Sequence, residues 1–312
     1  MQMRALFPGG PLVSVVGVTL SEPPCAGQPL RRTAALAPGT VDPDESGERA
    51  MADALASAVA CGVNLIDSDW ISQGGHAQEV LGRALQRIDT PLVLSGKAGP
   101  RLAFRGELLI DNSRANLLNQ AQDSLFRLKG RAFDLYSVHW PDSTAPAQTA
   151  RGLDDARHGG HTRFVGACNF STVQASALHA VLPLQVISAP LNLLQRDALD
   201  TLLPWCVQSG VGFVALDPLA DGLLAGRFTG SETFAEADPL FTQPRFGQAC
   251  DYAKSLHKRA QEAGLTGAQM ALAWVLQQPG VSAALIPVSE PARIAELCAA
   301  ADLQPDTSNL AP

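Results

Sequence analysis

The sequence contains little tyrosine, and this scarcity limits the acid–base chemistry available to it. Tyr136 and Tyr252 are its only two tyrosines, and aromatic residues make up 5% of the 312 residues. Tyr136 lies inside an expected strand and Tyr252 in an expected helix, whereas α/β barrel enzymes carry their catalytic groups at strand ends. Neither residue is therefore an obvious phenolic proton donor.

Clusters of basic residues and long apolar runs are also absent. The net charge is −7, with a pI near 5.3, so we expect neither a nucleic-acid partner nor an anionic membrane partner. No run of about 18 apolar residues is present, which argues against a membrane-spanning helix. The first 20 residues lack a continuous apolar segment and a small-residue cleavage site, so we expect a cytoplasmic location. The expected partner is a small-molecule substrate, and no pattern specifies the oligomeric state.

Paired cysteines and metal-binding patterns are missing as well. The six cysteines include no CxxC pair, and we expect free thiols in a reducing compartment. His158 and His161 have a spacing compatible with metal binding, but they lie in a Gly-rich loop without a third ligand. We therefore expect solvated turn residues there and no metal site.

The sequence does contain a regular alternation of apolar strands and amphipathic helices. This pattern, with 46% hydrophobic residues, is typical of a (β/α)₈ TIM barrel, and we predict that residues 1–312 form one such domain. The expected strands are Leu12–Val18, Val63–Ile66, Pro91–Lys97, Phe133–His139, Thr162–Asn169, Leu184–Ser188, Val211–Asp217 and Ala283–Pro287. The expected helices include Glu45–Cys61, the segment from His76, Ser113–Leu128 and Ala268–Gln278, and residues 21–45 and 228–250 are expected to be long loops.

Three polar residues stand at the ends of successive expected strands. They are Asp67, Lys97 and His139, and in a barrel the carboxyl ends of the strands form the active-site face. We expect the three side chains to converge there. On their own, Asp67 and Lys97 could equally form a structural ion pair.

Several segments of the sequence resemble the aldo-keto reductases. The stretch D-S-D-W-I-S-Q-G-G-H-A-Q-E-V-L-G is similar, without a gap, to the family wording D-T-A-x-x-Y-G-x-G-x-S-E-x-x-L-G. The resemblance extends to most of the chain and implies a barrel fold with NADPH as cofactor. Its other segments are Ser124–Asp142, Arg163–Ser171 and Asp217–Phe228.

The resemblance assigns catalytic roles, with one departure. In the family an aspartate, a tyrosine, a lysine and a histidine form a tetrad, and Asp67, Lys97 and His139 match three members. Ser72 stands at the tyrosine position. A serine hydroxyl is a much weaker acid than a phenol, and general acid catalysis contributes roughly 10²–10⁴-fold, about 3–5 kcal/mol of barrier. Ser72 either takes part in a modified reaction or only opens space, with His139 or water as alternative donors.

The positions that hold the cofactor in the family also differ. Cys168 and Asn169 stand where the family has the Ser-Asn pair that binds the nicotinamide amide, and Ser188 replaces a glutamine that reaches the same amide. Leu216 stands at the place of the stacking aromatic ring, and Asp217 replaces a serine near the pyrophosphate. A carboxylate repels a diphosphate, so the resemblance implies NADPH while these changes predict weak binding.

The last expected unit continues this pattern. Val288 replaces a glycine, Glu290 stands where a basic residue often meets the 2′-phosphate, and Leu297 replaces an asparagine that contacts adenine. Arg293 retains a possible phosphate contact. Trp70 and Trp140 follow strand ends directly, so we expect them at the mouth of the pocket, with core packing as the alternative.

Three functions remain compatible with these residues. The first and preferred hypothesis is a diverged aldo-keto-reductase-like enzyme that acts on a small carbonyl- or hydroxyl-bearing substrate in a redox-neutral reaction. The second is an NADPH-dependent oxidoreductase with a substitute proton donor. The third is a non-catalytic binding or regulatory barrel, which would not need three polar groups at its strand ends.

Overall fold

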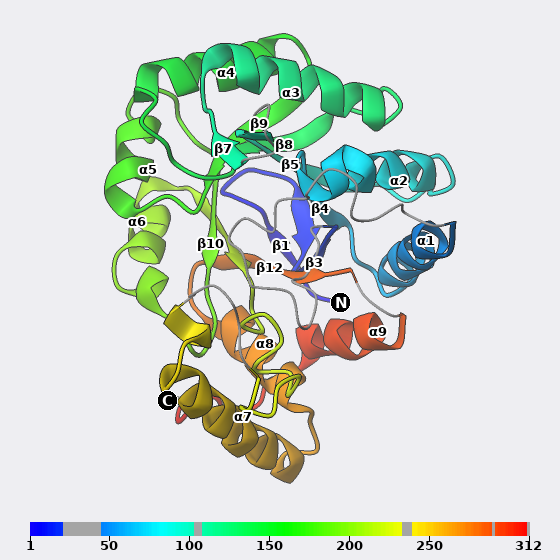
Figure 1. Cartoon of the computed structure of the whole chain (residues 1–312), viewed down its shortest axis with the longest axis vertical. Helices are drawn as coiled ribbons and strands as arrows, with labels where there is room; N and C mark the ends of the chain where they lie inside the picture. The colour runs from blue at the N-terminus through cyan, green and yellow to red at the C-terminus, as the bar shows by residue number, and fades with distance from the viewer. Residues whose placement is uncertain (21–44, 103–107, 233–238, 289–290, 311–312) are drawn as a thin grey trace.

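The fold is a closed barrel of parallel strands surrounded by helices, as a computed structural model shows (Figure 1). The structure describes residues 1–20, 45–102, 108–232, 239–288 and 291–310. The strands follow the chain in order around the barrel, and each pairs with its neighbours in parallel, which confirms the predicted (β/α)₈ fold. The barrel strands are β3 (Val16–Thr19), β4 (Leu65–Asp69), β5 (Val93–Ala98), β8 (Phe133–Val138), β9 (Thr162–Cys168), β10 (Val186–Pro190), β11 (Gly212–Leu216) and β12 (Val281–Pro287).

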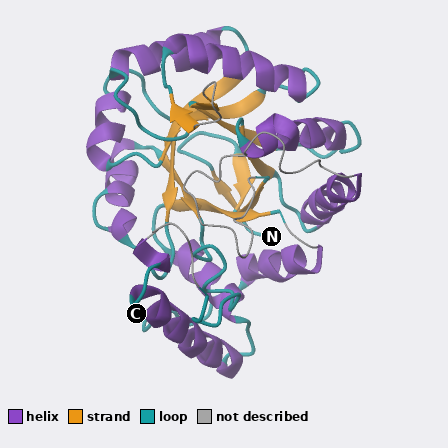
Figure 2. Ribbon diagram, in the orientation of Figure 1, coloured by secondary structure: helices purple, strands orange, loops and turns teal. Residues whose placement is uncertain are grey.

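The helices form a ring outside these strands (Figure 2). Apolar residues between the two layers form the larger core, while the long helix α7 packs on α8 at the outside of the ring. The helices are α1 (Glu45–Ala60), α2 (His76–Leu85), α3 (Arg114–Arg127), α4 (Pro146–His158), α5 (Thr172–His179), α6 (Leu202–Ser209), α7 (Arg245–Glu262), α8 (Gly267–Gln277) and α9 (Pro291–Ala299).

A short hairpin of β1 (Met3–Ala5) and β2 (Leu12–Ser14) precedes the barrel and contributes to its interior. Leu6 and Val13 pack against Leu65 and other residues from inside the barrel. The prediction of one strand over Leu12–Val18 is therefore wrong. The run divides at Val15. Ser14 belongs to the hairpin, where it pairs with Met3, and the first barrel strand starts at Val16.

The second barrel strand starts two residues later and ends three residues later than predicted. We expected Val63–Ile66 to end just before Asp67, but β4 continues to Asp69, so both aspartates belong to the strand. In the register with β5, Asp67 lies opposite Ser95 and Asp69 lies opposite Lys97. Because buried carboxylates need hydrogen-bonding or charged partners, these polar partners allow the strand to continue.

Two further segments differ from the sequence prediction. A hairpin of β6 (Pro100–Leu102) and β7 (Leu108–Ile110) follows β5 and was not anticipated. The loop expected over 228–250 ends earlier, because α7 begins at Arg245. The loop expected over 21–45 lies outside the described residues except for Glu45, which begins α1. Among the helices described, none is both long and apolar enough to cross a membrane.

Candidate active site

A buried ion pair joins β4 and β5 at the carboxyl end of the barrel. The Nζ atom of Lys97 donates to Oδ2 of Asp67, and the two residues are 4% and 0% exposed. The hydroxyls of Thr19 and Ser95 also donate to this carboxylate, at 2.9 and 2.8 Å. Burial is the largest single influence on the pKa of Lys97 and lowers it, but the attraction and hydrogen bond of Asp67, together with smaller contributions that include Asp69, outweigh burial, so the pKa lies above its ordinary value. The carboxylate of Asp67 is therefore bound by side chains of β3 and β5, and it holds Lys97 as a cation.

His139 lies on the other side of Lys97, directly after β8. Its backbone N–H donates to the carbonyl of Ala98 at 2.7 Å, which ties the end of β8 to β5. The imidazole stacks on Trp140 with ring centroids 3.6 Å apart and planes 14° from parallel. Burial lowers the pKa of His139 to about 3, with Asp69 opposing and Lys97 adding to the shift. At neutral pH the ring is therefore uncharged, and its Nδ1 has no hydrogen-bond partner among the described residues.

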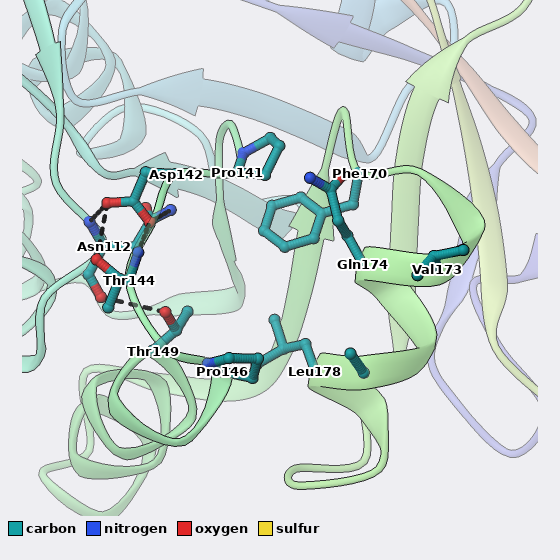
Figure 3. A pocket seen from close by; sticks show the side chains of 11 residues that line it. Asn112, Pro141, Asp142, Thr144, Pro146, Thr149, Phe170, Val173, Gln174 and Leu178 are labelled. Carbon is teal, nitrogen blue, oxygen red and sulfur yellow. Dashed lines mark hydrogen bonds between the residues drawn. The ribbon is translucent and has the colours of Figure 1, made fainter.

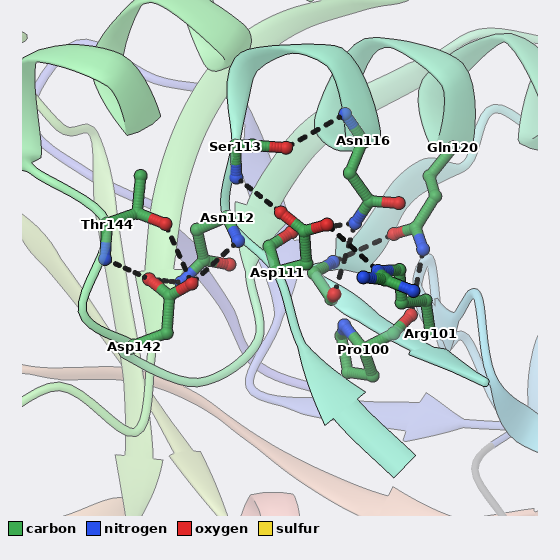
Figure 4. A network of polar contacts seen from close by, with 10 residues as sticks. Pro100, Arg101, Asp111, Asn112, Ser113, Asn116, Gln120, Asp142 and Thr144 are labelled. Atoms are coloured by element: carbon green, nitrogen blue, oxygen red, sulfur yellow. Dashed lines mark hydrogen bonds and ion pairs between the residues drawn. The ribbon is translucent and has the colours of Figure 1, made fainter. Parts of the chain in front are cut away.

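Side chains of α3 fix the chain directly after Lys97 (Figure 4). Gln120 accepts from the N–H of Gly99 and donates to the carbonyl of Pro100, both at 2.8 Å. Asn116 donates to the carbonyl of Gly99 at 3.1 Å. These amides replace the sheet pairing that the backbone loses at the end of β5.

A second set of contacts fixes the chain after His139. Asn112 donates to the carbonyl of Trp140 at 2.8 Å and to the carboxylate of Asp142 at 3.0 Å. Thr144 donates to the same carboxylate from its N–H and its hydroxyl (Figure 4). The stretch that carries His139 and Trp140 is thus held from outside the barrel.

Ser72 is buried next to a carboxylate that the sequence analysis did not select. Ser72 is 8% exposed and begins a short 3₁₀ turn, Ser72–Gly75, and its N–H donates to Oδ1 of Asp69 at 2.6 Å. Asp69 is 3% exposed and lies opposite Lys97 in the sheet. The sequence contained a signal for Asp69, because it follows Asp67 by two residues, and side chains two residues apart on a strand point to the same face of the sheet. That signal was missed because the strand was expected to end at Ile66.

Both tyrosines have hydroxyls that are bound away from this group of residues. Tyr136 is 1% exposed and donates to the carbonyl of Leu117 in α3 at 2.8 Å, and burial raises its pKa well above the ordinary value. Tyr252 in α7 donates to the carbonyl of Leu310. No phenol is therefore close to Lys97.

The positions assigned to the nicotinamide amide lie side by side on β9 and β10. Cys168 pairs in register with Ser188, and the N–H of Asn169 donates to the carbonyl of Ser188 at 2.9 Å. The Asn169 side chain donates to the carbonyl of His139 at 3.1 Å. Burial raises the pKa of Cys168 to about 12, so its thiol stays protonated. Asn169 and Ser188 are thus placed together, although the Asn169 amide already has a protein partner.

A carboxylate lies at one of the positions assigned to the pyrophosphate. Asp217 follows Leu216 at the end of β11, and its carboxylate accepts the backbone N–H of Asp221 at 2.7 Å. Backbone N–H groups are the usual phosphate ligands in such loops, and the N–H of Asp221 is bound to the carboxylate of Asp217. In α9, Arg293 pairs with Glu296 at 2.6 Å. Leu297 is buried, and Glu290 lies outside the described residues.

The two tryptophans have different surroundings. Trp140 stacks on His139 and is partly exposed. Trp70 has the guanidinium of Arg127 over its ring at 4.9 Å, and Arg127 also donates to its carbonyl at 3.2 Å. Trp140 thus lies beside a candidate catalytic group, while the ring of Trp70 lies against Arg127 of α3 and its backbone N–H donates to the carbonyl of Lys97.

A separate cavity of about 200 Å³ lies between α4 and α5, outside the ring of strands (Figure 3). Phe170, Gln174 and Leu178 line one side, and Thr149 and Pro146 line the other. None of Asp67, Lys97, His139 and Ser72 is among its lining residues.

An eight-stranded parallel barrel with an aspartate, a lysine and a histidine on successive strands defines an enzyme-like (β/α)₈ protein. A sequence model described as "Aldo/keto reductase family" matches residues 35–311. The chain belongs to the aldo/keto reductase family, as its motifs predicted.

Named relatives agree with this assignment. The chain is 30% identical over 260 residues to the aldo-keto reductase YhdN of Bacillus subtilis, covering 80% of this chain and 78% of the relative. It is 29% identical over 247 residues to the uncharacterized oxidoreductase Rv2298 of Mycobacterium tuberculosis, covering 77% and 73%. These relatives support an aldo-keto-reductase-like enzyme.

Solved structures show the same fold. The glycerol dehydrogenase AKR11B4 from Gluconobacter oxydans is 26% identical with a TM-score of 0.81, covering 99% of this chain and 92% of that one. An aldo-keto reductase from Klebsiella pneumoniae, solved in complex with NADPH, is 23% identical with a TM-score of 0.75, covering 99% and 93%.

Proposed function

We propose that this protein is a diverged aldo-keto-reductase-like enzyme that moves protons on a small carbonyl- or hydroxyl-bearing substrate without a phenol and without nicotinamide. The observation that carries this proposal is the position of the two tyrosines, because the hydroxyls of Tyr136 and Tyr252 donate to the carbonyls of Leu117 and Leu310. The ordinary proton donor of the family has no counterpart among them.

The remaining groups suit the formation of an enolate. Lys97 is held as a cation by Asp67, so it can stabilise negative charge on a substrate oxygen. His139 is neutral and its Nδ1 is not engaged by the described residues, so the ring can accept or donate a hydrogen bond to substrate. Redox-neutral proton transfer uses protein side chains of this kind and needs no hydride donor.

The residue at the position assigned to the pyrophosphate, Asp217, supports a redox-neutral reaction without nicotinamide. Asp217 brings a carboxylate to the place where a diphosphate would lie, and it binds the Asp221 N–H. A negative charge about 4 Å from a phosphate is unfavourable by about 1 kcal/mol in water and about 4 kcal/mol near a protein surface. We therefore propose that NADPH binds weakly and takes no part in the reaction.

A second candidate is an NADPH-dependent oxidoreductase with a substitute proton donor. It is favoured by the adjacent placement of Asn169 and Ser188 and by the name of a structural relative, a glycerol dehydrogenase. A non-catalytic barrel is the third candidate. The buried ion pair of Asp67 and Lys97 argues against it, because a scaffold gains little from such a pair.

Calorimetric titration with NADPH and with NADP⁺ separates the first two candidates. The proposal predicts dissociation constants well above the micromolar range for both. Micromolar or tighter binding of either nucleotide would favour the second candidate. We further propose a cytoplasmic location and a small-molecule partner, in keeping with the net charge of −7.

A further inference from the structure

Asp69 is a second carboxylate on the strand that carries Asp67. Side chains two residues apart on a strand point to the same face, so Asp67 and Asp69 share the barrel side of β4. Asp69 lies opposite Lys97 in the register of β4 and β5, and the N–H of the next residue, Trp70, donates to the carbonyl of Lys97 at 2.9 Å. The backbone thus holds Asp69 beside the candidate catalytic lysine.

The accessibility of Asp69 matches that of its neighbours. Asp69 is 3% exposed, compared with 4% for Lys97 and 8% for His139. Its charge acts on both of these groups: it adds to the raised pKa of Lys97 and opposes the lowering of the pKa of His139 by burial. Asp69 therefore belongs to the same electrostatic site as the predicted catalytic residues.

Asp69 also stands beside the position of the missing phenol. Its Oδ1 accepts the backbone N–H of Ser72 at 2.6 Å. The family wording D-T-A-x-x-Y places an alanine where this chain has Asp69 and a tyrosine where it has Ser72. One short segment thus lacks the phenol and contains an additional carboxylic group.

We propose that Asp69 is the catalytic residue that takes a proton from the substrate and returns it. The inference rests on the proposed redox-neutral function and adds a substrate class, the small α-hydroxy carbonyl compounds, because these carry both the carbonyl and the hydroxyl group of that function and a hydrogen on the carbon next to the carbonyl. The Asp69 carboxylate removes the proton from the carbon next to the carbonyl. The C–H electron pair becomes the C=C bond of an enolate, and the C=O π pair becomes a lone pair on oxygen. Lys97 stabilises this oxygen, and return of the proton reverses the electron shifts, so no oxidant or reductant is consumed.

A purely structural role for Asp69 has to be separated from this one. The contact with the Ser72 N–H fixes the start of the Ser72–Gly75 turn, and loss of that contact would disturb the site indirectly. Asp69→Asn retains an oxygen that accepts this hydrogen bond but removes the negative charge and, with it, the proton-transfer group. Asp69→Ala removes both and introduces the residue of the family wording.

The experiment follows solvent deuterium entering dihydroxyacetone and glyceraldehyde in D₂O without nicotinamide, by proton NMR. The variants are Asp69→Asn, Asp69→Ala and the control Asp89→Asn, an exposed residue in the loop between α2 and β5. Thermal unfolding of each variant reports whether it is folded. Because a placed base contributes roughly 10²–10⁴-fold, we expect Asp69→Asn and Asp69→Ala to lose at least about 100-fold in exchange rate, and Asp89→Asn to retain the wild-type rate.

The outcomes distinguish this inference from the function on which it rests. If folded Asp69→Asn exchanges deuterium at the wild-type rate, Asp69 is not the base and the inference fails. If in that case a Lys97→Met variant that is shown by thermal unfolding to be folded exchanges no deuterium, the proposed function stands without the inference. If Asp69→Asn is active and Asp69→Ala inactive, the role is structural. If the wild type exchanges neither compound, the proposed function and substrate class are both wrong.

Discussion

Lys97 donates to the carboxylate of Asp67 at a place where neither residue is more than 4% exposed. Removing one partner of such a pair leaves a buried charge without compensation, which costs about 3–5 kcal/mol. We therefore expect Lys97→Met to lower the free energy of unfolding by about that amount in urea titrations.

The matched control for the ion pair is the more exposed pair of Arg101 and Asp111. Its atoms are 2.9 Å apart, and its side chains are 42% and 27% exposed. Exposed pairs contribute about 0–1 kcal/mol, so Asp111→Asn is expected to have a small effect. If Lys97→Met and Asp111→Asn lowered the free energy of unfolding by equal amounts, burial would not set the strength of the contact between Lys97 and Asp67.

The depressed pKa of His139 makes stability depend on pH in a defined window. The unfolded chain binds a proton at this residue below about pH 6.5, whereas the folded chain binds it only near pH 3. The unfolded state thus binds more protons in between. The contribution of the neutral ring to the free energy of unfolding is fully present above pH 6.5. It is lost as pH falls towards 3, by up to about 1.4 kcal/mol per pH unit.

His139→Gln tests this window. Urea unfolding at several pH values should show a smaller loss of stability below pH 6.5 in the variant than in the wild type. His158→Gln serves as the control, because the His158 side chain is 73% exposed, and it should follow the wild-type curve. A His139→Gln curve parallel to the wild type from pH 6.5 to 4 would mean that this ring is not kept neutral by burial.

Restoring tyrosine at position 72 separates an impaired reductase from a rebuilt site. We expect Ser72→Tyr alone to gain no carbonyl reductase activity, because we propose that NADPH binds weakly and because a nearby carboxylate such as Asp69 raises the pKa of a phenol. NADPH oxidation with a panel of aldehydes and ketones measures this. The double variant Asp69→Ala/Ser72→Tyr removes the opposing carboxylate and is the more favourable background. A gain of one or more decades in Ser72→Tyr would support the oxidoreductase candidate.

The effect of Asp217 on nucleotide binding is tested by Asp217→Ser, which introduces the residue found in the family. Removal of the charge is expected to tighten NADPH binding by about 1–4 kcal/mol at low salt, at least roughly fivefold. Calorimetry of Asp217→Ser and of the exposed control Asp197→Ser provides the comparison. Unchanged affinity in Asp217→Ser would show that this carboxylate does not face the nucleotide.

Much of the barrel could be predicted from the sequence because its strands are apolar runs with polar residues at their ends. Asp67, Lys97 and His139 were selected in this way, and the structure places Asp67 and Lys97 in direct contact. The β6 and β7 hairpin was missed because its strands are short and lie outside the barrel. Leu12–Val18 was read as one strand because apolar character alone does not show where the partner strand changes.

Asp69 was missed for a different reason. An apolar pattern ends at the first charged residue, whereas the real strand ends where its pairing ends, and β4 pairs with β5 as far as Asp69 and Lys97. Buried polar residues near a strand end are therefore easily assigned to the following loop. The roles of Asn169, Ser188 and Asp217 came from the family resemblance, because spacing alone contains no information about a nucleotide.

The most direct test of a redox-neutral reaction follows both chemistries in one sample. The wild-type protein is incubated in D₂O with NADPH and either dihydroxyacetone or glyceraldehyde, and NMR records the nucleotide and the carbon-bound hydrogens together. The account predicts that deuterium enters the carbon next to the carbonyl while NADPH remains reduced. Stoichiometric oxidation of NADPH to NADP⁺ with reduction of the carbonyl compound to its alcohol, and without deuterium at the carbon next to the carbonyl, would contradict it.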